Sequence, residues 1–193
     1  IVIGDLYLSA LAVPDDQPLG DRELLLQVAA IRAKLLDAAT FVAIRYGFVV
    51  ASADDALAKC AAHLARWKHL LIEHREHVEM TLKTAAIAPQ ARPDRHDFTS
   101  GADYLRALHA VTQASNADLH LRAAADRLLV PLSVKHRWLH RDEKSVELVA
   151  LIERSRLDDA RAAGESLRAQ CPDVPFLLSG PWPLEVFADA DHE

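Results

Sequence analysis

The chain has 193 residues, of which 51% are hydrophobic and 26% are charged, an ordinary composition for one globular domain or two small ones. Its 28 acidic residues outnumber its 22 basic residues and give a formal net charge of −6. Nucleic acids and anionic membranes favour basic surfaces, so the charge balance argues against both as partners.

The N-terminal half is predicted to alternate strands and helices. We expect a strand over residues 1–13, a helix capped by Asp21, and a second strand over residues 40–51. The second strand is rich in β-branched and aromatic residues on both faces, which is typical of a central strand buried on two sides. Another helix follows, capped by Ser52 or Asp54. The clean alternation over residues 78–83 predicts a half-exposed strand.

The C-terminal half is predicted to begin after a linker over residues 86–98, a stretch with two prolines among small and charged residues. Ser100 and Asp103 form a capping-box pattern that predicts a helix, which we expect to break near Asn116. The remaining predicted elements are a strand over residues 128–134, a strand over residues 144–152, a helix over residues 157–167 and a strand over residues 174–178.

These elements divide into two small α+β domains with antiparallel sheets. We place the first domain at residues 1–85 and the second at residues 99–193, joined by the linker over residues 86–98. Because the chain begins at Ile1 rather than at methionine, we expect further residues upstream, including one more strand of the first domain.

The cysteines and the apolar runs indicate the cellular compartment in which the protein is found. Cys60 and Cys171 lie far apart in the sequence and form no CxxC motif, so we expect reduced, buried thiols rather than a disulfide framework. The longest apolar stretches fall well short of a membrane span, and no signal peptide is recognisable. These features predict a cytoplasmic protein.

The ten histidines raise the possibility of a metal-dependent enzyme, above all around His69, Glu73, His74 and His77. Residues three or four apart on a helix share a face and could share a metal. The helix is expected to end near Glu76, however, and HExxH is absent, so a solvated helix end is the better interpretation. GxSxG and the glycine-rich phosphate loops are also absent. We therefore expect no metal, no cofactor and no catalysis.

Arg45-Tyr46-Gly47 interrupts the apolar run over residues 40–51. The arginine places a cation in the middle of the predicted strand, and the glycine two residues later indicates a bulge or a close approach. Arg45 could reach the sheet edge along its own methylenes. Alternatively, its charge could be held at a partner interface, where arginine is enriched.

The segment Gly180-Pro181-Trp182-Pro183 is the most constrained in the chain. Glycine permits unusual backbone dihedrals, while each proline fixes φ and removes a backbone donor. These residues therefore hold one large indole in a set direction. Nothing in the segment can act as an acid, a base or a nucleophile, so it builds a surface or a corner.

Three segments resemble the gas vesicle GvpF/GvpL family. Residues 41–47 are similar to an apolar family strand that ends in Arg-aromatic-Gly, and the helix through Leu57 and Leu64 precedes the strand at Val78 with the family's spacing. Residues 178–183 are similar to the family's C-terminal Thr/Ser-Gly-Pro-Trp-Pro signature. The departures are local: Ala43 replaces the usual proline, for example.

The resemblance implies two α+β domains, the first of them ferredoxin-like. It also implies an accessory or minor structural component that contacts the small, hydrophobic gas vesicle shell protein, with other accessory proteins as further partners. On this basis the protein would be found in the cytoplasm and at the gas vesicle. Arg45, Tyr46 and Gly47 would lie at or near the contact, and Gly180–Pro183 would fix the shape of the second domain.

The alternative function is a small-molecule-sensing regulatory module, because ferredoxin-like domains often bind ligands between sheet and helix. No glycine-rich turn or convergent set of polar residues in the sequence supports this alternative.

Overall fold

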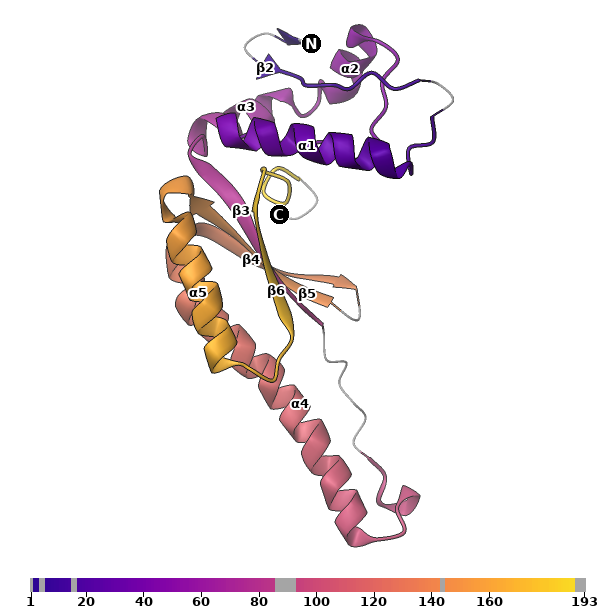
Figure 1. Cartoon of the computed structure of the whole chain (residues 1–193), viewed down its shortest axis with the longest axis vertical. Coiled ribbons are helices and arrows are strands. Elements are labelled where there is room, and N and C mark those ends of the chain that lie inside the picture. Colours follow the sequence, from indigo (N-terminus) through magenta and orange to yellow (C-terminus); the bar gives the residue numbers. More distant parts are fainter. Residues whose placement is uncertain (1, 4–5, 15–16, 86–92, 143–144, 190–193) are drawn as a thin grey trace. The chain divides into compact units, whose positions relative to one another are not determined.

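The computed structural model describes residues 2–3, 6–14, 17–85, 93–142 and 145–189 (Figure 1). The chain forms two compact units. Unit 1 comprises the N-terminal residues up to Val78 and the C-terminal segment from Trp182, whereas unit 2 comprises Glu79–Pro181. The domain bounds predicted from the sequence, 1–85 and 99–193, differ from these. Residues 86–92 of the predicted linker lie outside the described residues.

Unit 1 is mainly helical. Its elements are an antiparallel pair of short strands, β1 (Val2–Ile3) and β2 (Leu6–Tyr7), and the helices α1 (Arg22–Ala38), α2 (Ala53–Cys60) and α3 (Leu64–Glu73). The predicted N-caps are confirmed: the Asp21 carboxylate accepts from the backbone N–H of Glu23 at 2.6 Å, and the Ser52 hydroxyl accepts from that of Asp55 at 3.1 Å. The predicted strand over residues 1–13 is wrong beyond Tyr7, because residues 8–13 form no strand.

The C-terminal segment of unit 1 pairs with the residues that follow α1. Leu184 and Val42 form a parallel bridge. Around it, Ala43 N donates to Leu184 O and Leu184 N donates to Phe41 O, both at 2.9 Å. Leu184 and Phe187 are buried. Residues 41–43 and Leu184, which lie far apart in the sequence, therefore pair in this part of unit 1.

Unit 2 is based on a four-stranded sheet with the order β4-β5-β3-β6. Its main elements are β3 (His77–Ala85), α4 (Gly101–Leu128), β4 (Ser133–Asp142), β5 (Ser145–Glu153), α5 (Leu157–Gln170) and β6 (Phe176–Trp182), with short 3₁₀ turns at Arg95–Asp97, Val130–Leu132 and Arg154–Arg156. Strands β4 and β5 are antiparallel, with Trp138 opposite Leu148. The α+β class with an antiparallel sheet is thereby confirmed.

The strand pairing corrects the prediction that residues 1–85 form a ferredoxin-like domain. The β-α-β-β-α-β order of ferredoxin-like folds begins at β3 and ends at β6. β3 lies between β5 and β6 in the sheet, so its hydrogen-bonded neighbours both come from the C-terminal half of the chain. The strand that the sequence assigns to the first domain is thus the first strand of the second sheet.

The core of unit 2 lies between the sheet and the two helices. It draws one leucine each from β3, β5, α4 and α5: Leu82, Leu148, Leu121 and Leu167. Gly164 brings α5 close to the sheet, because a Cβ at this position would lie 2.5 Å from the side chain of Leu178. Val78, Met80 and Leu82 are all buried, as predicted for the inward face of residues 78–82. Glu79, which was predicted to lie on the exposed face, is also buried, so the half-exposed strand is wrong at this residue.

Two local predictions for unit 2 are wrong for one reason. α4 runs unbroken through Asn116, and residues 128–134 form the helix end and a 3₁₀ turn before β4 begins at Ser133. Leu121, Ala125 and Leu129 recur every four residues and are all buried in the same cluster. Helical packing therefore extends into the segment whose apolar alternation predicted a strand.

Candidate partner-binding surface

Residues 40–51, predicted as a buried central strand, form a loop, so that prediction is wrong. The chain turns at Arg45–Phe48, where Phe48 N donates to Arg45 O at 3.2 Å. Gly47 has a φ of +88°, which a residue with a side chain adopts only with strain. The predicted trio of Arg45, Tyr46 and Gly47 is therefore brought together in a single turn rather than along a strand.

The turn is tied to two other segments of unit 1. The Arg32 guanidinium of α1 donates to Ile44 O at 2.6 Å, immediately before the turn. The Tyr46 hydroxyl donates to Leu19 O, in the segment before α1. Both bonds use backbone carbonyls as acceptors, so they fix the path of the loop.

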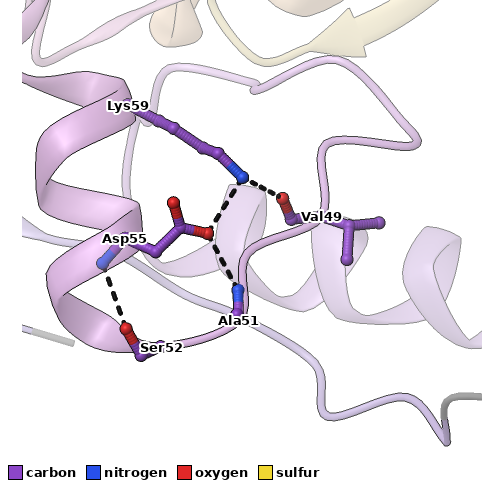
Figure 2. A network of polar contacts seen from close by, with 5 residues as sticks. All are labelled: Val49, Ala51, Ser52, Asp55 and Lys59. Atoms are coloured by element: carbon purple, nitrogen blue, oxygen red, sulfur yellow. Dashed lines mark hydrogen bonds and ion pairs between the residues drawn. The ribbon is translucent and has the colours of Figure 1, made fainter.

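Helix α2 holds the far end of the loop through the network in Figure 2. The Lys59 ammonium donates to Val49 O at 3.0 Å and to the Asp55 carboxylate at 2.9 Å. The same carboxylate oxygen accepts from Ala51 N at 2.9 Å. Ser52 and Asp55 also form the N-cap of the helix. The same part of α2 thus forms the N-cap of the helix and holds the end of the loop.

This network makes the end of the loop sensitive to acid. The hydrogen bond from Lys59, followed by that from Ala51 N–H, holds the pKa of the Asp55 carboxyl below its ordinary value of 3.8. Because the folded-state pKa is lowered, the anchoring contributes stability above the unfolded-state pKa of about 3.9. It is lost as the pH falls through the lower folded-state pKa.

We expect Lys59→Met to raise the pKa of Asp55 back towards 3.8, because the largest stabilising contact is removed. An NMR titration of the Asp55 carboxyl in both proteins measures this directly. Hydrogen exchange of the Ala51 amide should become faster in the variant at neutral pH. An unchanged titration in Lys59→Met would contradict the network.

The loop presents one cation and three large apolar side chains to its surroundings. Arg45 and Tyr46 are exposed, Phe48 is 42% exposed and Val49 is 59% exposed. Arginine and aromatic residues are enriched where proteins bind one another. The sequence prediction missed Phe48 and Val49 because it assigned them to a buried strand. Gly47 as a turn residue, and the Asp55–Lys59 spacing, were the signals that could have identified them.

The structure places the constrained C-terminal segment at the end of β6. Gly180 has a φ of +128°, and a Cβ there would lie 2.9 Å from Glu79 O and 2.6 Å from Met80 Sδ. Trp182 is 48% exposed, and Pro183 is buried. The glycine thus allows β6 to approach the backbone of β3 closely, and the chain then turns into the segment that carries Leu184.

The histidines around the end of α3 contact Glu73 and one another. The Glu73 carboxylate lies 3.4 Å from both His69 Nδ1 and His74 Nε2. The rings of His74 and His77 meet edge to face, with centroids 5.2 Å apart. Among the described residues, no group of three or more His, Cys, Asp or Glu side chains is arranged to hold a metal ion.

The cysteines are free and buried. Burial raises the pKa of both the Cys60 and the Cys171 thiols, which makes them poor nucleophiles. Cys171 Sγ lies 3.7 Å from His120 Nδ1. In the part of the chain that the structure describes, no helix is long and apolar enough to cross a bilayer.

The fold is similar to that of two gas vesicle proteins of known structure. With GvpF from Microcystis aeruginosa the TM-score is 0.66 at 13% identity, over 92% of this chain and 83% of the other. With GvpF from Anabaena sp. PCC7120 it is 0.65 at 14% identity, over 92% of this chain and 82% of the other. A comparison with curated proteins gives no match.

The family model for gas vesicle synthesis protein GvpL/GvpF matches residues 1–188. The chain therefore belongs to this family, and the resemblance seen in the sequence is confirmed. Family membership supports a role in gas vesicle assembly.

Proposed function

We propose that this protein is an accessory or minor structural component of gas vesicle assembly that binds the hydrophobic shell protein and catalyses no reaction. The loop Arg45–Val49 is the proposed contact. Its exposed Phe48 and Val49, next to the Arg45 cation, are the observation that carries the proposal. Family membership supplies the class of partner.

The physical case rests on the nature of the partner surface. A small, very hydrophobic shell protein aggregates when its apolar surface is left in water, so an assembly partner must cover part of it. Phe48 and Val49 offer apolar contact, and the bonds from Arg32 and Lys59 fix the loop backbone in advance. A fixed loop loses little conformational freedom on binding, which favours affinity.

The test is capture of a gas vesicle shell protein from cells that co-express it with this chain. We expect selective capture that resists added salt, because the contact is mainly apolar. Phe48→Asp and Val49→Asp should each weaken capture by about tenfold or more. Both side chains are exposed, so neither substitution should unfold unit 1.

Ile72→Asp is the matched control, because Ile72 is also an exposed apolar residue, at 68% exposure, but lies on α3 rather than on the loop. Its capture should equal that of the wild type. Unchanged capture after Arg45→Glu would remove Arg45 from the contact. If the folded wild-type chain retains no shell protein, the proposed function itself is wrong.

A further inference from the structure

Unit 1 is discontinuous in the sequence, whereas unit 2 is a single stretch of chain. Among the residues that the structure describes, the buried apolar side chains of unit 1 come from both of its parts. Six precede unit 2 and four follow it: Leu24, Leu36, Ala56, Cys60, Leu70 and Val78, then Leu184, Val186, Phe187 and Ala188. The last residues of the chain therefore supply a large share of the apolar core of unit 1.

The C-terminal segment also completes hydrogen bonding in unit 1. At residues 41–43, Leu184 provides the acceptor for Ala43 N–H and the donor for Phe41 O. At α3, the Arg66 guanidinium donates to Asp189 O at 3.1 Å. Backbone polar groups that become buried need partners, so docking of this segment satisfies the backbone as well as filling the core.

The residues before Glu79 bury little apolar surface on their own. Two of their six buried apolar residues, Ala56 and Cys60, are small, and small domains are marginally stable even with a complete core. Unit 2 has no such deficit, because its main core cluster comes from one continuous stretch. We therefore expect unit 2 to fold first and unit 1 second. This order is the reverse of the usual one, in which N-terminal domains fold first during synthesis.

We propose that docking of residues 182–189 makes this protein able to bind its partner, so that only a complete chain binds. The inference rests on the proposed function, because the loop Arg45–Val49 follows closely on residues 41–43, to which the segment is bonded. Leu184 follows Val42 by 142 positions, which takes about 7–28 s to synthesise at roughly 5–20 residues per second. During that time the loop has no folded unit to hold its backbone, and the incomplete chain captures no shell protein.

Pulsed hydrogen exchange during refolding of the full chain tests the order of folding without any shell protein. We expect the amides of β5 to become protected first. The amides of Ala43 and Leu184 should then gain protection in the same phase as those of Ala56 and Trp67, which bond at the starts of α2 and α3. Protection of Ala56 and Trp67 before Leu184, or before β5, would overturn the proposal.

Leu184→Asp measures the coupling at equilibrium, and Leu177→Asp is its matched control at an exposed leucine of β6. In Leu184→Asp, amides of α1, α2 and α3 should exchange about thirtyfold faster or more, because the whole unit depends on the docked segment. Exchange in β5 should stay unchanged, which shows that unit 2 remains folded. Phe187→Asp should act like Leu184→Asp, since Phe187 is also buried.

Capture of shell protein connects this coupling to binding. Leu184→Asp changes no residue of the loop, yet it should reduce capture by about tenfold or more, whereas Leu177→Asp should equal the wild type. The proposal is wrong if unit 1 keeps its protection in Leu184→Asp, or if that variant captures shell protein normally. If exchange shows the coupling but the wild-type chain captures no shell protein, the proposed function is wrong, and only the order of folding stands.

Discussion

Gly180→Ala is expected to lower the free energy of unfolding by about 2–4 kcal/mol. Two causes add. The φ of +128° is one that residues with a side chain rarely adopt, and the new Cβ would lie 2.9 Å from Glu79 O and 2.6 Å from Met80 Sδ. The sulfur can move aside, but the carbonyl belongs to β3. Chemical denaturation followed by circular dichroism measures the loss.

Two other glycines separate these causes. Gly47 has a positive φ of +88° but no atom within 4 Å of a Cβ, so Gly47→Ala should cost only the strain. That cost is about 1–2 kcal/mol. Gly20 has neither the strained φ nor a close neighbour, so Gly20→Ala should change stability by less than about 1 kcal/mol. If Gly180→Ala behaved like Gly20→Ala, the tight approach of β6 to β3 would be refuted.

Features decided by local chemistry were predictable from the sequence. The caps at Asp21, Ser52 and Ser100 follow from side chains that reach backbone N–H groups two or three residues ahead. The strand over residues 78–83 follows from strict alternation. The unusual backbone conformation at Gly180 was also predictable, because glycine permits such dihedrals and the following proline restricts them.

Features decided by distant partners were not predictable. The composition of residues 40–51 suits a buried strand, and what makes the segment a loop is hydrogen bonding from Arg32 and Lys59, on two different helices. Likewise, the alternation around Val78 predicts that a strand exists but not which strands flank it. The neighbours of β3 turned out to be β5 and β6. This pairing moved the ferredoxin-like order to the other half of the chain.

The candidate site shows the same division. The sequence singled out Arg45 as an unexpected cation and Gly47 as a break in the apolar run, and both observations point to the turn. It could not show that Phe48 and Val49 are exposed, because apolar residues in a run are normally taken as core. Their exposure depends on where α1 and α2 fix the loop backbone.

Leu184→Ala tests the part that long-range pairing plays in unit 1. Leu184 is completely buried, at 0% exposure, and follows the Gly180–Pro183 segment directly. Truncating a buried leucine leaves a cavity and costs about 2–5 kcal/mol. We expect that loss in the unfolding of unit 1, together with faster hydrogen exchange of the Ala43 and Leu184 amides, which bond across the bridge.

Leu177→Ala is the matched control, because it makes the same change at a leucine of β6 that is 57% exposed. It should cost less than about 1 kcal/mol, since little area returns to water. A clear difference between the two variants would show that the segment after Pro183 is an integral part of unit 1. Equal, small effects would instead mean that residues 41–43 hold their conformation without it, and the bridge at Val42 would then be incidental to the stability of the unit.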